Sequence, residues 1–309
     1  MKRCLLPAIA VLSLAFAAAT TARAQASGSM SSSMPMPSTM ASMPAPPNIL
    51  MIETDNIKPY MTVPYDKVAE QYIAPSVKAK LPGSVIAMEA LTGAPRAQYL
   101  FAYDSFQGMQ DMEDMINKND ALHSTFKALD AQEAAYTSEV HNVIWHYRDD
   151  LSNSAASADI PHDRFWESIV FHIKPGHDQE FEAVAKMYKD AYAKIGVNLH
   201  WATFESEMGA SDTYIVLLPM VSLKDEDDGL ARQKTVMDAF GADGMHQMEE
   251  TARDAYMSID DTLWEVNPKT SYVPKEWIAA NPDFWAPKPA GMMKSTMAPA
   301  MKPAPKPAQ

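Results

Sequence analysis

Asn56-Ile57-Lys58-Pro59 and His172-Ile173-Lys174-Pro175 carry the same short signature, 116 residues apart. Matching side chains follow each copy at one spacing: Tyr65, Val68, Ala69 and Tyr72 in the first, and Phe181, Val184, Ala185 and Tyr188 in the second. Further along, Ala135-Tyr136 before Trp145 matches Ala255-Tyr256 before Trp264. A unit of about 110 residues therefore occurs twice, and the architecture follows from this repeat.

The second copy begins with a strand that has apolar side chains on both faces. Trp166, Ser168, Val170 and His172 alternate with Ile169, Phe171 and Ile173. Such a strand is covered on both sides. Helical spacing follows, then a hairpin, a second helical stretch and a closing strand. The predicted elements are a strand at 166–173, a helix at 178–195, strands at 198–207 and 212–220, a helix at 224–258 broken near 241–244, and a strand at 261–266.

The first copy predicts the same order of elements. They are a strand at 48–57, a helix at 64–74, strands at 84–91 and 97–104, helices at 107–118 and 121–138, and a strand at 141–147. Pro75 is expected to end or kink the first helix early. In this β-α-β-β-α-β topology, four antiparallel strands carry both helices on one face. The other face needs cover, so we predict an α+β fold in which two tandem ferredoxin-like units pack sheet to sheet.

A family resemblance enters through Ile173-Lys174-Pro175-Gly176 and the following Glu180-Phe181-Glu182. This stretch resembles the strand-turn-helix opening of the dimeric α/β-barrel superfamily. The superfamily includes antibiotic-biosynthesis-type monooxygenases, the NIPSNAP proteins and the haem-binding chlorite dismutase and dye-decolorising peroxidase branches. Its members pair two ferredoxin-like units, so the resemblance implies an intramolecular dimeric α/β barrel over residues 48–266. The motif supports a fold and not an activity.

The two ends of the chain differ from the repeats in composition. Residues 1–24 read as an export signal with a small-x-small cleavage site that ends at Ala24, which predicts a periplasmic or secreted protein. Its apolar run is too short to span a bilayer comfortably, so no stable membrane anchor is expected. The remaining divisions are a disordered Met/Ser/Pro-rich linker at 25–47, repeat 1 at 48–152, repeat 2 at 163–288 and a disordered Pro/Lys/Met tail at 289–309. Trp277, Phe284 and Trp285 are expected to strap the end of repeat 2 onto the second unit, with an aromatic ligand clamp as the alternative.

Charge and cysteine usage exclude several kinds of partner and chemistry. The net charge of −13 disfavours nucleic acid and anionic membrane surfaces. Cys4 is the only cysteine and lies inside the signal, so disulfides, thiolate-bound zinc, iron–sulfur clusters and cysteine nucleophiles are excluded from the mature chain. The chain also has no G-x-S-x-G, G-x-G-x-x-G, phosphate loop or H-E-x-x-H.

In folds of this kind, ligands tend to lie in a cleft between a sheet and its helices. The candidate ligand-binding residues are Trp145, His172, His200 and Trp201, and the expected ligand is a small apolar molecule. The expected strand order places a strand between His172 and His200, so they are not expected to share a metal. Each candidate also has a purely structural explanation. His172 ends a strand, where a histidine is often held by hydrogen bonds. Trp145 and Trp264 hold equivalent positions in the two repeats, which favours a packing role. If there is a single site, repeat 2 is expected to hold it.

An oxygenase, cofactor-independent or haem-assisted, is the enzyme alternative, with His172 and His246 as catalytic candidates. His246 lies in Gly244-Met245-His246-Gln247-Met248, where flanking thioethers suit haem or copper. The competing reading is an exposed helix start after a glycine break. No cofactor is predicted firmly from these residues.

Copper handling is the third alternative. Thioethers are soft ligands that select Cu(I), and the linker contains Met30, Met34, Met36, Met40 and Met43. A flexible spacer explains the same composition. We therefore predict an exported small-molecule-binding protein, either a monomer with pseudo-dimeric repeats or a homo-oligomer, with the oxygenase and copper readings left open.

Overall fold

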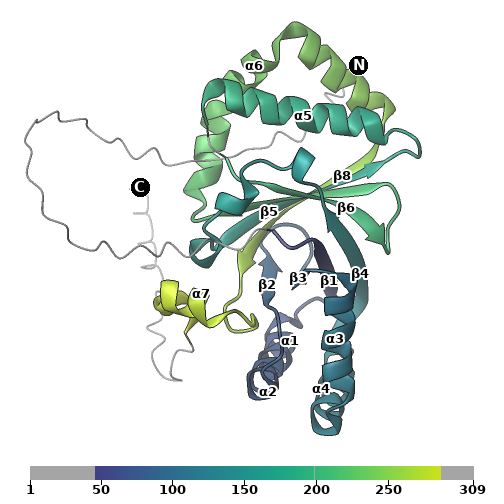
Figure 1. Ribbon diagram of the computed structural model, residues 1–309, viewed down its shortest axis with the longest axis vertical. Helices are drawn as coiled ribbons and strands as arrows, with labels where there is room; N and C mark the ends of the chain where they lie inside the picture. The colour runs from purple at the N-terminus through teal and green to yellow at the C-terminus, as the bar shows by residue number, and fades with distance from the viewer. Residues whose placement is uncertain (1–45, 198, 287–309) are drawn as a thin grey trace, which may run out of the picture.

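The computed structural model describes residues 46–197 and 199–286. In this part of the chain, strands close into one barrel in the order β1-β3-β2-β8-β5-β7-β6-β4 (Figure 1). The strands are β1 Ile49–Ile57, β2 Val85–Ala90, β3 Arg96–Tyr103, β4 Thr137–Tyr147, β5 Phe165–Ile173, β6 Ala202–Met208, β7 Thr213–Met220 and β8 Tyr256–Val266. The helices are α1 Thr62–Ala69, α2 Ile73–Ala79, α3 Phe106–Asn117, α4 Asp120–Glu133, α5 Asp178–Ile195, α6 Lys224–Asp254, α7 Lys275–Ala280 and α8 Pro282–Trp285.

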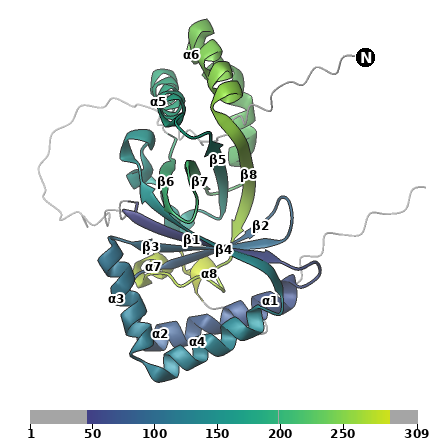
Figure 2. The ribbon, with the colours of Figure 1, turned by 90° about the vertical axis from the view of Figure 1, so that its right-hand side faces the viewer.

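The barrel consists of two sheets with the same internal order. Unit 1 contributes β4-β1-β3-β2 and unit 2 contributes β8-β5-β7-β6, each antiparallel throughout. Helices α1 to α4 lie outside the first sheet, and α5 and α6 lie outside the second, at opposite ends of the molecule (Figures 1 and 2). This arrangement confirms the predicted fold class, because both sheets turn their helix-free faces inward. Two ferredoxin-like units thus close a single barrel within one chain.

Two strand pairs between the units close the barrel. At one seam β2 pairs with β8, with Met88 opposite Val266, and at the other β4 pairs with β6, with Trp145 opposite Ser206. Inward-facing residues of both sheets form one buried cluster, which we call the barrel core. Its members include Leu50, Ile52, Met88, Trp145, Trp166, Phe204, Ile215 and Trp264. Each unit thus supplies the cover that the other unit's sheet requires.

The repeated signature performs the same structural task in each unit. A bulge falls between Asn56 and Ile57 where β1 meets β4, and another between His172 and Ile173 where β5 meets β8. The lysine that follows each bulge donates its ammonium to a carbonyl just before the unit's last strand. Lys58 Nζ lies 2.9 Å from the Ala135 oxygen, and Lys174 Nζ lies 2.8 Å from the Asp254 oxygen. The signature therefore ties the strand-to-helix turn to the end of the second helical layer.

Several element boundaries differ from the sequence-based prediction. The last strands begin at Thr137 and Tyr256, before the predicted 141 and 261, and their first halves are largely exposed. The helix predicted at 64–74 is divided by a 3₁₀ turn at 70–72 and continues to Ala79, so Pro75 marks an interruption and not the end. The predicted helix at 121–138 ends at Glu133. The break predicted near 241–244 is confirmed, because Gly241 has non-helical backbone angles inside α6.

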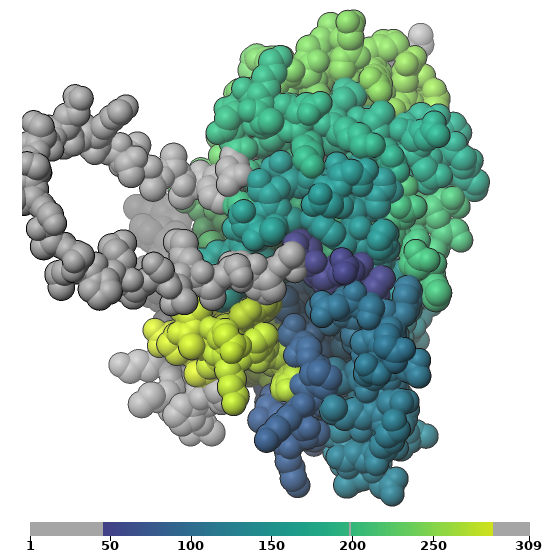
Figure 3. Space-filling model, viewed as in Figure 1, coloured from purple at the N-terminus to yellow at the C-terminus, as the bar shows by residue number. Residues whose placement is uncertain are grey.

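The segment after β8 contacts unit 1 and the linker between the units (residues 148–164). At the start of the predicted repeat 2, the Arg164 guanidinium lies 5.0 Å from the Phe284 ring centroid, and the strap onto the second unit stays a prediction. Tyr272 exchanges backbone hydrogen bonds with Val85 of β2, and the Tyr272 hydroxyl donates to the Leu81 carbonyl at 2.8 Å. The Trp285 indole nitrogen donates to the Pro161 carbonyl at 2.8 Å. In the space-filling view this segment, drawn in yellow, lies against the side of unit 1 (Figure 3).

The predicted signal at 1–24 and tail at 289–309 lie outside the described residues, as does the predicted linker apart from its last two residues. Within the described ranges, the helices are too short or too polar for any of them to cross a bilayer. The domain boundaries stay predictions.

A matched pair of glycines tests the β4–β6 seam. Gly93 and Gly209 hold equivalent hairpin positions and both have positive φ, 81° and 96°. A Cβ at Gly209 would lie 2.5 Å from the Asn142 carbonyl oxygen of β4, whereas one at Gly93 would meet only the end of the Arg96 side chain at 3.5 Å. We expect Gly93→Ala to lower the free energy of unfolding by about 1 kcal/mol through backbone strain. Gly209→Ala should cost about 2 kcal/mol more, because β4 must move.

Urea denaturation of both variants measures this difference through the transition midpoint at unchanged slope. An equal decrease in the free energy of unfolding in the two variants would show that the hairpin at Gly209 is not packed tightly against β4.

Candidate functional site

A pocket of about 510 Å³ opens at one end of the barrel, between the two sheets. Its walls come from strands of both units and from the segments that connect them. The lining residues are Pro46, Pro47, Leu50, Gly83, Ser84, Ile86, Leu100, Ala102, Asp104, Ala155, Ala158, Ile160, Trp166, His200, Trp201, Ala202, Phe204, Leu217, Pro219, Pro274 and Trp277. We call this the barrel pocket. It differs from the expected cleft between a sheet and its helices, and it does not belong to repeat 2 alone.

The floor and walls of the barrel pocket are apolar. Alternation along the strands turns Leu50 and Trp166 inward, and both belong to the barrel core. Phe204 of β6 and Leu217 of β7 are each 2% exposed and complete the floor. The pocket is therefore an extension of the core that the side chains do not fill.

The linker between the units forms one side of the pocket. Asn153 and Trp201 exchange backbone hydrogen bonds of 3.0 Å, which hold the linker against the residues before β6. The Trp201 indole donates to the Leu151 carbonyl at 2.9 Å, so its ring orientation is fixed. Trp277 of α7 closes another side and lies 6.0 Å from Trp285, centroid to centroid.

Polar lining is sparse and comprises Ser84, Asp104 and His200. Asp104 is exposed, whereas Ser84 and His200 are half-buried. His200 Nδ1 lies 2.8 Å from the Ser154 carbonyl oxygen, so the neutral ring carries its proton on Nδ1. Such a pocket suits a ligand with an apolar body and one polar end.

The structure brings together two of the four predicted ligand-binding residues. His200 and Trp201 line the barrel pocket, although they precede β6 and do not lie on it as predicted. Trp145 is 4% exposed in the barrel core, opposite Leu50 of the neighbouring strand. His172 lies at the other end of its strand from the pocket residue Trp166, where its Nε2 is 3.1 Å from Asp260 Oδ2.

Sequence reasoning missed Trp166 as a pocket residue and took Trp277 mainly as a packing residue, with a ligand clamp as the alternative. The inward set of the first strand in unit 2 already contained Trp166, so its face was predictable. That Trp166 lines a pocket could not be predicted, because this depends on how far the linker between the units and α7 lie from the end of the barrel.

The remaining candidates lie elsewhere. His246 sits on α6 with 71% of its side chain exposed, 3.5 Å from Glu250, and does not suit the axial position of a haem enclosed beneath the helices. The five linker methionines proposed for copper lie outside the described residues. Within the described ranges, no three His, Cys, Asp or Glu side chains are grouped to hold a metal ion.

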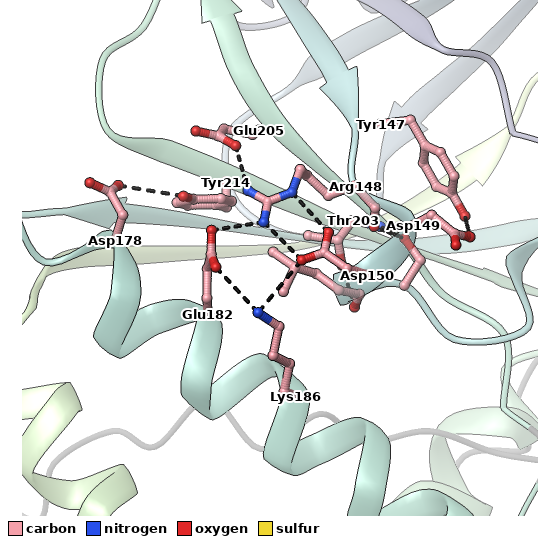
Figure 4. A network of polar contacts seen from close by, with 12 residues as sticks. Tyr147, Arg148, Asp149, Asp150, Asp178, Glu182, Lys186, Thr203, Glu205 and Tyr214 are labelled. Carbon is pink, nitrogen blue, oxygen red and sulfur yellow. Dashed lines mark hydrogen bonds and ion pairs between the residues drawn. The ribbon is translucent and has the colours of Figure 1, made fainter.

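Arg148 is the centre of a polar network at the start of the linker between the units (Figure 4). Its guanidinium donates to Glu182 of α5 at 2.7 Å, to Glu205 of β6 at 2.6 Å and to Asp150 at 2.9 Å. Its backbone nitrogen donates to the Thr203 carbonyl at 2.9 Å. The Arg148 guanidinium holds the pKa of Asp150 below its usual range. One cation at the end of β4 thus joins unit 1 and the linker to both layers of unit 2.

No known protein-family model matches the chain, and no curated protein matches it. Solved structures do resemble it. An anthrone oxidase-like protein has a TM-score of 0.49 at 11% identity, covering 71% of this chain and 91% of its own. A candidate monooxygenase from Fusobacterium nucleatum has a TM-score of 0.48 at 12% identity, covering 71% and 91%. A chlorite dismutase mutant from Candidatus Nitrospira defluvii has a TM-score of 0.44 at 6% identity, covering 76% and 95%.

These likenesses agree with the barrel topology described above. Because their TM-scores lie below 0.5, they carry no argument about the activity, substrate or cofactor of this chain. The oxygenase alternative therefore stays a prediction.

Replacing Arg148 tests whether the network holds the β4–β6 seam. Arg148→Met keeps the apolar stem and leaves Glu182, Glu205 and Asp150 without their shared cation. We expect a loss of about 2 kcal/mol in the free energy of unfolding, less than for a fully buried pair because the carboxylates are partly exposed. Urea denaturation measures the loss.

Arg253→Met is the matched control, since Arg253 makes its ion pair with Asp254 in solvent. It should leave the transition midpoint unchanged. A loss in Arg148→Met no larger than in this control would contradict the proposed role.

Proposed function

We propose that this protein is an exported binding protein for a small, largely apolar molecule with one polar end, held in the barrel pocket. The main support for this proposal is the pocket itself, whose volume of about 510 Å³ lies within the range of roughly 300–1,000 Å³ typical of small-molecule sites. Its lining combines three tryptophans with aliphatic side chains and few polar groups. Burial of the ligand's apolar surface supplies the affinity, and Ser84, Asp104 and His200 receive the polar end.

The enclosing parts support the same proposal. The strands that line the pocket belong to a closed barrel. The linker between the units is held by backbone hydrogen bonds to Trp201 and by the Trp285 indole of α8, which donates to the Pro161 carbonyl. A pre-formed apolar site loses little conformational entropy when a ligand enters. The geometry therefore favours binding without a large rearrangement of the chain.

A pocket-filling substitution tests this function. Ala202 lines the pocket from β6, and Ala202→Phe places a ring in its lumen. The probe is 1-anilinonaphthalene-8-sulfonate, which fluoresces in apolar sites. We expect Ala202→Phe to weaken probe binding at least tenfold, about 1.4 kcal/mol, and to reduce quenching of tryptophan fluorescence.

Ala128→Phe, on the exposed side of α4, is the control and should bind the probe as the original chain does. Thermal unfolding confirms that both variants fold. Unchanged binding in Ala202→Phe would place the probe outside the barrel and remove the support for this function.

The proposed export rests on the sequence of residues 1–24. N-terminal sequencing of the protein recovered from periplasm or culture medium is expected to start at Gln25. Recovery only as an uncleaved chain from the cell interior would contradict export and leave the binding proposal standing.

A further inference from the structure

The two units differ sharply in the layer between sheet and helices. At the offset of the repeat, Glu53 and Asp55 of β1 fall on Ile169 and Phe171 of β5, and Tyr65 of α1 falls on Phe181 of α5. In unit 2 these positions belong to one apolar core cluster. In unit 1 the corresponding cluster is much smaller, with Ile57, Tyr65, Ala69 and Ala97 as its buried members. The repeat therefore retains its fold while unit 1 replaces apolar packing with acids and hydroxyls.

Burial differs in the same way. Glu53 of β1 and Tyr99 of β3 are only half-buried, whereas their unit 2 counterparts Ile169 and Val216 are buried. The neighbouring positions Met51, Phe101 and Tyr103 are half-buried as well. Solvent thus reaches the layer between this sheet and helices α1 to α4, which lie across its outer face (Figure 2). Glu53 is thus in contact with solvent, whereas Asp55 and Tyr65, at 2% and 1% exposed, are reached only when neighbouring side chains move.

Hydrogen bonds join the acids and tyrosines in two groups, which together draw on five elements. The Tyr65 hydroxyl donates to Asp55 Oδ2 at 2.6 Å and lies 2.9 Å from the Tyr99 hydroxyl. The Tyr72 hydroxyl donates to Asp130 at 2.7 Å and lies 3.1 Å from Glu133. Asp55 is only 2% exposed, and its Oδ1 has no hydrogen-bond partner among the described residues. A buried carboxylate oxygen without a donor is an acceptor that the protein itself leaves unsatisfied.

The charges in this layer are of one sign. Burial, followed by the Asp55 carboxylate, raises the pKa of Glu53 to about 7. Burial, followed again by Asp55, raises the pKa of Glu133 to about 8, and burial raises the pKa of Asp55 itself. The groups that face the acids are Tyr65 of α1, Tyr72 of the 3₁₀ turn, Tyr99 of β3, Asn142 of β4 and Asp130 of α4. A cation bound among these acids would lower their pKa values and displace protons from them.

We propose that the acid–tyrosine layer of unit 1, built by Glu53, Asp55, Tyr65, Tyr99 and Glu133, binds the ammonium group of a small primary amine with an apolar body. An ammonium group brings three N–H donors and one positive charge to a site that offers carboxylate and hydroxyl acceptors. The apolar body lies along the half-buried Met51, Phe101 and Tyr103. Aromatic rings next to the acids add cation–π attraction. This site is separate from the barrel pocket, which lies on the other face of the sheet.

An organic cation fits better than a metal ion. Within the described ranges no three acidic or histidine side chains stand close enough together to hold a metal, whereas an ammonium group can combine a carboxylate with tyrosine hydroxyls as acceptors. Tyrosine hydroxyls are also poor ligands for the divalent ions that carboxylates attract. The amine thus accounts for the tyrosines as well as the acids.

Isothermal titration with 2-phenylethylamine tests the proposal, with 2-phenylethanol as the neutral isostere. At pH 8.5 the amine remains mostly ammonium, as a lysine side chain does. Glu53 and Glu133, with pKa values of about 7 and about 8, have then lost most of their protons. We expect binding of the amine at pH 8.5, at least tenfold weaker binding at pH 6, and no binding of the alcohol. Titration at pH 7.5 in two buffers of different ionisation enthalpy should show proton release on binding.

Variants assign the heat to this layer. Glu53→Gln and Asp55→Asn should each weaken amine binding at least tenfold, and Tyr65→Phe should weaken it less. Asp120→Asn, at an exposed position of α4, is the matched control and should bind normally. Thermal unfolding verifies folding, and Glu53→Gln stays informative if Asp55→Asn fails to fold, because Glu53 is only half-buried. Ala202→Phe should retain amine binding, which separates this site from the barrel pocket.

Equal affinity for amine and alcohol, pH-independent affinity, or full binding in Glu53→Gln would each overturn the proposal. Loss of amine binding in Ala202→Phe alone would move the amine to the barrel pocket and overturn it as well.

Discussion

The inward face of each four-stranded sheet is the constraint on which this structure depends. Helices cover only the outer face, so the other face would expose a continuous apolar surface. The chain removes that surface by closing two sheets edge to edge through the β2–β8 and β4–β6 pairs. Closure leaves no sheet edge open along the paired lengths and turns Trp145, Trp166 and Trp264 into a shared core. Neither unit has this cover without the other.

Closure also explains why the pocket lies where it does. A barrel made of short strands fills its centre with side chains but has less to place at its ends. At one end the chain has added the inter-unit linker and α7, which stand around the opening and narrow it. At the other end the His172 ring makes hydrogen bonds to both Asp260 and Thr213. The two ends therefore differ because of connecting segments that lie outside the repeat.

Sequence alone predicted the parts that depend on periodicity and repetition. Helix α5 was predicted with both of its ends correct, because glycine and proline flank a strong amphipathic pattern. The starts of β4 and β8 were missed, because residues such as Glu139 and Asp260 are exposed there and leave no alternating apolar pattern. The pocket was missed for a different reason. Trp166 and Trp277 are 111 positions apart, and only the folded linker and strap bring them together.

The same comparison of repeats that revealed the fold also holds the signal for the acidic layer. Two positions on the buried face of one strand are Ile169 and Phe171 in one copy and Glu53 and Asp55 in the other. Burying carboxyls in place of apolar side chains weakens unit 1's own core, so selection for stability alone would not favour the exchange. The barrel tolerates it because its shared core lies on the opposite face of the sheet and keeps its packing. Because the chain contains two units, the apolar layer under the helices of unit 2 can stabilise the fold. The corresponding layer of unit 1 can then carry acidic and hydroxyl side chains.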